Sequence, residues 1–157
     1  MEARLDAVRA APGAYRAMLG LESYVDESTG LGKSLLALVK LRASQINGCA
    51  YCIDMHSKNA RTAGEGEQRL YGLMAWREMP FYDERERAAL AWTEAVTLVA
   101  DTHVPDEVYE QATRQFSEEE LVNLTLAIVT INGWNRLCIA FRVVAGNYKP
   151  QGAAKRA

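Results

Sequence analysis

Apolar side chains recur every three or four residues along most of the chain, which is the spacing that one face of an α-helix requires. No segment alternates apolar and polar residues in the manner of a β-strand with hairpin turns. We therefore predict an all-α fold of about six to eight helices. The predicted helices cover residues 13–26, about 31–46, 49 to about 63, about 67–77, about 83–99, 105 onward, and 117 to about 144.

Several of these helices carry recognisable start or stop residues. Asp83 resembles a cap for the helix that follows it, and Ser117 with Glu120 forms a capping-box pattern. Gly64 and Gly66 interrupt the third predicted helix. The segment after Ser117 is apolar on more than one side, which predicts a central helix surrounded by the others.

Length and charge indicate a small soluble protein. A chain of 157 residues can bury a core without a metal or disulfide, so we expect one domain over residues 1–157, with a core at about 12–148 and a mobile tail at 151–157. The formal net charge is −2 without blocks of one sign, so nothing indicates a nucleic-acid or membrane surface. No apolar run approaches the roughly 18 residues that span a bilayer, and the start lacks a signal peptide. We expect a cytoplasmic protein.

The chemically active side chains are concentrated in segment 47–56, with the sequence NGCAYCIDMH. Cys52 and His56 are four residues apart and are therefore neighbours on a helix. Gly48 marks a helix entry, so Cys49 should lie at a helix N-terminus, where free N–H groups and the helix dipole favour a thiolate. Two cysteines at this spacing can form a disulfide and reopen it. The pattern indicates thiol redox chemistry.

Other roles for the cysteines fit the sequence less well. Three cysteines do not make a secreted disulfide framework. A structural zinc site needs four ligands, so Cys138 or His103 would have to approach the pair. We expect instead that Cys138 is a small core residue and that His103 lies in a solvated loop. Haem attachment needs a histidine directly after the second cysteine, where this chain has Ile53. We therefore expect no metal and no cofactor.

The residues around the cysteine pair resemble the signature of a known family. The run 38–56, LVKLRASQINGCAYCIDMH, is similar to the CxxCxxxH element of the AhpD-like, carboxymuconolactone decarboxylase superfamily, in its single-domain alkylhydroperoxidase branch. The similarity covers roughly residues 12–148. It implies an all-helical fold, a homo-oligomer that is a trimer or hexamer, and reduction of hydroperoxides by the paired thiols. Further matching positions are Arg61, Gly64, Leu70, Trp76, Arg77, 86–90, 94–97 and 131–136.

The resemblance also implies a role for each residue of the element. Cys52 matches the cysteine that attacks peroxide, Cys49 the resolving cysteine, and His56 the histidine that relays a proton from Cys52. An external dithiol or disulfide reductase then reduces the disulfide again. Peroxide should thus convert Cys49 and Cys52 to a disulfide while Cys138 stays free. The helix dipole alone favours Cys49 as the attacking thiolate, whereas the nearby His56 favours Cys52.

One position departs from the family pattern. The family has a glutamate twelve residues before the first cysteine, which orients the histidine, and this chain has Ala37 there. The departure predicts low or altered peroxidase activity unless another acid, such as Glu22, Glu27 or Glu94, takes its place. Two other functions stay open. One is a non-redox superfamily enzyme acting on a lactone or carboxylated ring compound, with His56 as general base. The other is a catalytically silent redox-sensing or binding subunit.

For two groups of side chains the sequence does not determine what they pack against. The helix predicted at 13–26 offers more apolar side chains than one small core is expected to absorb, which also predicts an oligomer. For Trp134, Asn135 and Arg136 we expect a packed helix with paired polar groups. The other interpretation is that they line the active site or a subunit contact.

Overall fold

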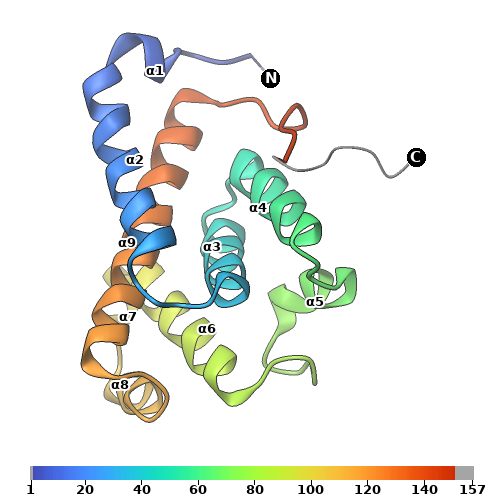
Figure 1. Ribbon diagram of the computed structural model, residues 1–157, viewed down its shortest axis with the longest axis vertical. Helices are drawn as coiled ribbons and strands as arrows, with labels where there is room; N and C mark the ends of the chain where they lie inside the picture. The colour runs from blue at the N-terminus through green and yellow to red at the C-terminus, as the bar shows by residue number, and fades with distance from the viewer. Residues whose placement is uncertain (1, 151–157) are drawn as a thin grey trace.

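Nine α-helices and one 3₁₀ turn form the regular structure of residues 2–150, the part of the chain that the computed structural model describes. No β-strand occurs among these residues, which confirms the predicted all-α fold. In chain order the elements are α1 (Ala7–Ala10), α2 (Pro12–Glu27), α3 (Lys33–Asn47), α4 (Ala50–Thr62), α5 (Glu67–Gly72), η1 (Leu73–Ala75), α6 (Glu84–Thr97), α7 (Val99–Thr102), α8 (Asp106–Thr113) and α9 (Glu118–Phe141) (Figure 1).

Helix α3 lies in the middle of the bundle and packs against α4, α6 and α9 (Figure 1). Its side chains enter two apolar clusters: Val39 packs with Leu124 of α9, and Leu38 packs with Leu90 of α6. Full burial of a side chain of this size contributes about 1.5–3 kcal/mol to folding. This shared core fixes the position of α3, which leads directly into Cys49.

Two predicted helix starts are confirmed. The Asp83 side chain accepts from the backbone N–H of Glu86, whose own side chain accepts from the backbone N–H of Asp83. Ser117 and Glu120 make the same reciprocal pair at the start of α9. Each pair satisfies N–H groups that the first turn of a helix leaves without a partner.

Some predicted boundaries differ from the structure. Helices α1 and α7 have only four residues each, too few for an apolar period to reveal them. The helix predicted at about 67–77 is α5, which ends at Gly72 and tightens into η1. Helix α9 ends at Phe141, before the predicted end, because Arg142 adopts a left-handed backbone with φ of 54°. The predicted mobile tail lies outside the described residues.

By length and composition α9 could span a bilayer, contrary to the expectation that no segment approaches that limit. Its surroundings give the reason for its apolar composition, because it packs against α2, α3 and α6. It also carries buried asparagines whose side chains reach other helices: Asn132 donates to Thr97 of α6, and Asn135 donates to Ser44 of α3. The prediction that α9 is surrounded by the other helices is wrong, because Val122 and Val129 of α9 are 69% and 51% exposed and α3 takes the middle position.

Candidate active site

A tight turn between α3 and α4 places Cys49. Gly48 adopts a left-handed backbone with φ of 66° and closes α3, a conformation that costs glycine less than any other residue. The N–H of Gly48 donates to the carbonyl of Gln45, and the N–H of Cys49 donates to that of Ser44 (3.0 Å). Cys49 is also the N-cap of α4, so the end of one helix and the start of the next meet at this residue, as predicted.

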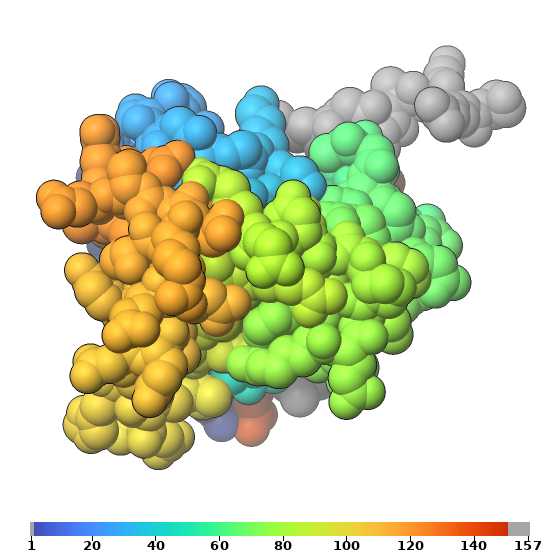
Figure 2. Space-filling model, turned by 90° about the horizontal axis from the view of Figure 1, so that it is seen from below, coloured from blue at the N-terminus to red at the C-terminus, as the bar shows by residue number. Residues whose placement is uncertain are grey.

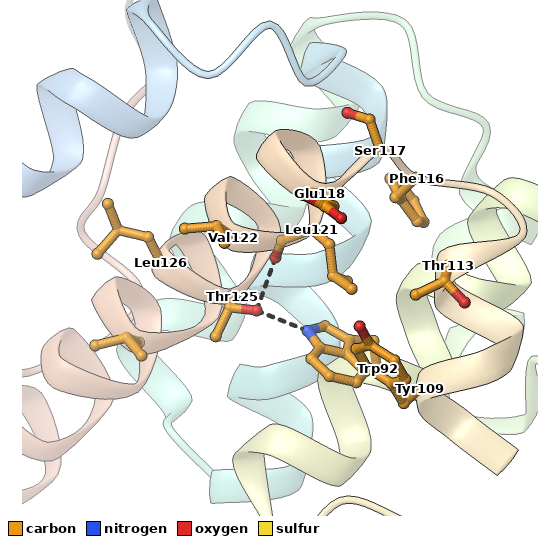
Figure 3. A pocket seen from close by; sticks show the side chains of 11 residues that line it. Trp92, Tyr109, Thr113, Phe116, Ser117, Glu118, Leu121, Val122, Thr125 and Leu126 are labelled. Atoms are coloured by element: carbon orange, nitrogen blue, oxygen red, sulfur yellow. Dashed lines mark hydrogen bonds between the residues drawn. The ribbon is translucent and has the colours of Figure 1, made fainter. Parts of the chain in front are cut away.

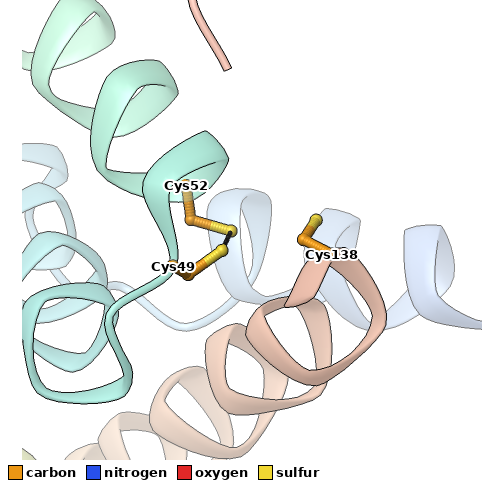
Figure 4. A group of neighbouring side chains, drawn as sticks. All are labelled: Cys49, Cys52 and Cys138. Carbon is orange, nitrogen blue, oxygen red and sulfur yellow. Dashed lines mark hydrogen bonds between the residues drawn. The ribbon is translucent and has the colours of Figure 1, made fainter. Parts of the chain in front are cut away.

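Three cysteine sulfurs gather at this turn. The Sγ atoms of Cys49 and Cys52 lie 2.9 Å apart, and both residues are buried, each with 1% exposure. Cys138 approaches them from α9, and the three sulfurs lie within 4.8 Å of one another (Figure 4). The expected closeness of Cys49 and Cys52 is thus present. Cys138 packs against the buried cluster that contains Ala43 and Ile131, in line with the expected core position, but it is partly exposed and also belongs to the thiol group, which was not predicted.

Cys49 carries the acidic thiol of the group. Interaction with the Cys138 thiol, and then with the Cys52 thiol, lowers the pKa of Cys49 to about 3. Interactions with Cys138 and Cys49, together with burial, raise the pKa of Cys52 far above its usual range. Interaction with Cys49, together with burial, raises the pKa of Cys138 to about 12. The opposite directions of these shifts favour a thiolate on Cys49 over one on Cys52 or Cys138.

The sulfur group offers ligands for a metal ion as well as a pair for a disulfide. Two thiolates bound to one zinc at about 2.3 Å with a tetrahedral angle lie roughly 3.8 Å apart. The 2.9 Å between Cys49 and Cys52 lies about midway between that separation and the length of about 2.05 Å in a disulfide, so it favours neither. Cys138 does approach the pair, as the zinc alternative requires, but His103 lies exposed after α7. Among residues 2–150 the sulfur group supplies three ligands, not four.

His56 is a buried imidazole on α4. It is 8% exposed, and its Nε2 atom has no hydrogen-bond partner within the described part of the chain. Burial and, to a smaller extent, the nearby Lys40 cation lower the pKa of His56 to about 4, although Asp26 and Cys49 oppose the shift. His56 is therefore neutral at pH 7 and a weak base.

A charged group centred on the buried Lys40 lies beside His56. The Nζ atom of Lys40 donates to Glu22 and to Asp26, at 2.6 Å each, and so joins α3 to α2. A buried ammonium requires such partners because desolvation of an isolated charge is very costly. The sequence contained a signal for this group that we did not use: Lys40 interrupts the apolar run from Leu38 to Leu41.

None of the three proposed substitute acids serves His56 among the residues that the structure describes. Glu22 accepts from Lys40 and from the indole N–H of Trp134. Glu94 accepts from Trp76 and pairs with two arginines, Arg42 and Arg77. Glu27 is exposed at the end of α2. The expected partner of His56 is therefore missing at Ala37 and is not replaced.

An amide network ties the thiol turn to α9. Asn47 donates through Nδ2 to Asn132 (2.9 Å) and Asn135 (2.8 Å), and Asn135 donates to Ser44 (3.1 Å). Asn135 is fully buried, which confirms the expected packing. It also acts on Cys49, whose pKa it lowers in addition to the larger effects of Cys138 and Cys52. This contact agrees with the other interpretation of the sequence, in which Asn135 lines the active site.

A broad groove lies away from the thiols. It measures about 760 Å³ and is formed by α6, α8 and the first half of α9, and Figure 3 shows Trp92 in it, with its indole N–H bonded to Thr125 (2.9 Å). Seen from below, α8 and the start of α9 form one side of the molecule (Figure 2). Cys49, Cys52 and His56 do not line this groove. Its apolar lining includes Trp92, Tyr109, Phe116, Leu121, Val122 and Val129.

Comparison with known proteins identifies the family. Residues 12–95 match the carboxymuconolactone decarboxylase family. The chain belongs to this family. The matched region runs from α2 into α6 and includes Cys49, Cys52 and His56, whereas Cys138 lies beyond it. The predicted resemblance to the AhpD-like, carboxymuconolactone decarboxylase superfamily is thereby confirmed.

Several proteins are similar to this chain over most of its length. The uncharacterized protein YdfG of Bacillus subtilis (strain 168) is 44% identical over 140 residues, which are 89% of this chain and 95% of YdfG. ATU0492 of Agrobacterium tumefaciens, a protein of unknown function named as a candidate antioxidant defence protein AhpD, is 45% identical. Its structure matches with a TM-score of 0.90 over 94% of this chain and 100% of its own. The debrominase Bmp8, at 24% identity, shares the fold with a TM-score of 0.80, over 88% of this chain and 74% of its own.

The burial of neutral His56 predicts a pH-dependent stability. The unfolded chain binds a proton at this histidine near pH 6.5, whereas the folded chain does so near pH 4. The free energy of unfolding should therefore fall between pH 6.5 and 4, with a contribution from His56 of about 3 kcal/mol. Urea unfolding of the native chain and His56→Gln across this range measures the effect. Parallel pH profiles for the two proteins would contradict it.

Proposed function

We propose that this chain is a thiol-dependent peroxidase that reduces hydroperoxides through a dithiol and disulfide cycle of Cys49 and Cys52. The observation that carries the proposal is the pair of buried sulfurs 2.9 Å apart, one with a pKa lowered to about 3 by the neighbouring Cys138 and Cys52 thiols. A thiolate attacks peroxide far better than a thiol does, and a second thiol at this distance can resolve the product.

The pKa difference within the pair supports Cys49 as the attacking residue. Its thiolate attacks the outer peroxide oxygen, the O–O bond breaks, and the alkoxide leaves and takes up a proton from solvent. The sulfenic acid on Cys49 then condenses with the Cys52 thiol, which forms the disulfide and releases water. Two thiols lose two electrons and the peroxide gains them. The resemblance instead assigns attack to Cys52, and variants of the two cysteines distinguish the assignments.

His56 serves the second step in this proposal. It lies one helical turn after Cys52 on α4, so it is placed to accept the proton of the Cys52 thiol as that sulfur attacks. A pKa of about 4, set mainly by burial, makes His56 a weak acceptor. We therefore propose that this step is slow in the native chain, and that an external dithiol completes the cycle.

A thiol titration tests the proposal. Reduced protein with its three cysteines is treated with one equivalent of cumene hydroperoxide, and free thiols and remaining peroxide are measured in parallel. We expect one peroxide to be consumed and the thiol count to fall from three to one. Three thiols with intact peroxide would refute the proposal. A chain that forms its disulfide with other oxidants, yet consumes no peroxide, would be the silent redox-sensing subunit.

We further propose that the chain assembles as a homo-oligomer through the groove of α6, α8 and α9. Val122 and Val129 project from α9 at this groove and are 69% and 51% exposed, and exposed apolar surface of this kind is typical of subunit contacts. Sedimentation at micromolar concentration should give a multiple of 17.4 kDa. Val129→Glu should shift the distribution toward the monomer, and a native chain that sediments as a monomer would contradict the proposal.

A further inference from the structure

Cys138 forms no bond in the proposed peroxide step, yet its sulfur lies within 4.8 Å of both sulfurs of the pair (Figure 4). It comes from α9, whereas the pair comes from the start of α4. Thiol–disulfide exchange requires a thiol that can approach one sulfur of a disulfide and displace the other. The disulfide of Cys49 and Cys52 would form directly beside such a thiol.

We propose that Cys138 is a third redox-active thiol, which takes over one half of the Cys49–Cys52 disulfide by exchange and presents the oxidised bond to an external dithiol. The origin of the disulfide rests on the proposed function, but the exchange itself does not. Cys49 and Cys52 are each 1% exposed, whereas Cys138 is partly exposed. The three sulfurs are buried, but residue Cys138 lies nearer the surface than either member of the pair, so a disulfide that includes Cys138 is easier for a reductant to reach.

The exchange step moves no net electrons. Cys138 loses its proton to solvent and attacks the Cys52 sulfur; the Cys52–Cys138 bond forms, the Cys49–Cys52 bond breaks, and Cys49 leaves as a thiolate. Cys49 is the better leaving group because contact with the Cys138 and Cys52 thiols lowers its pKa to about 3, and a thiol of lower pKa leaves faster.

Reduction then starts at the Cys138 end of the new bond. One thiolate of the external dithiol attacks the Cys138 sulfur, and Cys52 leaves. The second thiol of the reductant closes its own disulfide and releases Cys138. The reductant loses two electrons, and its two protons return to Cys52 and Cys138. Cys49 stays a thiolate, ready for the next oxidant.

The exchange can be tested without peroxide, so that its failure and the failure of the peroxidase proposal are distinguishable. Reduced protein is oxidised with one equivalent of diamide, quenched in acid, alkylated and digested with trypsin. Cys49 and Cys52 share one tryptic peptide that excludes Cys138, so a bridge to Cys138 joins two peptides in the mass spectrum. We expect this joined product beside the Cys49–Cys52 bridge in the native chain, and as the main product in Cys49→Ser. Absence of the joined product from both proteins would overturn the proposal.

A separate experiment tests whether Cys138 makes the disulfide accessible to a reductant. Oxidised native protein and oxidised Cys138→Ser are reduced with dithiothreitol, and the return of thiols is followed with time. We expect Cys138→Ser to be reduced at least about tenfold more slowly. The matched control is Ile139→Ser, which places the same hydroxyl on the next, exposed residue of α9 and should be reduced at the native rate. Equal rates for native protein and Cys138→Ser would overturn the delivery role.

Discussion

Cys49→Ser should lower the rate of hydroperoxide consumption by at least about a thousandfold, the size of loss that follows removal of a nucleophile. The reason is that Cys49 holds the thiolate, since the neighbouring Cys138 and Cys52 thiols lower its pKa to about 3 while that of Cys52 is raised. Stopped-flow measurement of peroxide loss under pseudo-first-order conditions gives the rate. Cys52→Ser should keep one oxidation event per chain, because only the resolving step is lost.

The matched experiment identifies the attacking sulfur directly. In a Cys138→Ser background no third thiol can resolve the sulfenic acid, so Cys52→Ser should accumulate it on Cys49, where dimedone labelling and mass spectrometry detect it. Cys49→Ser in the same background should show little label. The reverse pattern, with label on Cys52 when Cys49 is replaced, would support the assignment that the family resemblance gives.

Ala37→Glu should raise peroxide turnover by at least about tenfold, within the range that general acid–base assistance contributes. Ala37 lies on α3 three residues before Lys40 and packs against the cluster that contains Ala60 of α4. A carboxylate there would face α4 and give His56 a charged partner, which raises its pKa from about 4, the value set mainly by burial. His56 would then accept the Cys52 proton more readily.

The control for charge is Ala37→Gln, which matches the size of glutamate without its negative charge. Peroxidase rates of the native chain, Ala37→Glu and Ala37→Gln are compared against pH. The buried Lys40 cation should offset much of the cost of burying the new carboxylate, so the melting temperature should change little. Equal rates for all three proteins would refute the role of His56 as proton acceptor.

The spacing of residues along the sequence predicted which side chains are neighbours on one helix. It did not predict which side chains two different helices bring together. The positions of Cys49, Cys52 and His56 followed from the sequence because a helical period converts sequence spacing into distance. Cys138 lies on α9, and no periodic pattern states which residue of a distant helix faces the start of α4. The four-residue helices α1 and α7 escaped prediction for a related reason, since one turn is too short to show a period.

The buried polar groups illustrate a second limit of prediction from the sequence. The sequence places Lys40 among leucines, so its need for an acidic partner could have been predicted. The choice of Glu22 and Asp26 could not, because both acids sit on α2 and several other acids were equally available. The missing partner of His56 was predicted from the family pattern at Ala37, and the structure shows why no nearby acid compensates: each candidate is exposed or already bonded.

At Cys49, which follows the turn at Gly48, the residue that would best stabilise the fold differs from the residue that thiol reactivity needs. Cys49 is the N-cap of α4, yet its side chain makes no capping hydrogen bond to the first turn. Serine, aspartate or asparagine at an N-cap stabilises a helix by about 1 kcal/mol relative to residues that cannot cap. Folding alone would therefore favour one of those residues, whereas thiol chemistry requires the cysteine. The sulfur that we propose as the nucleophile thus occupies a place where an inert hydroxyl would give the more stable protein, an instance of the trade-off between stability and activity.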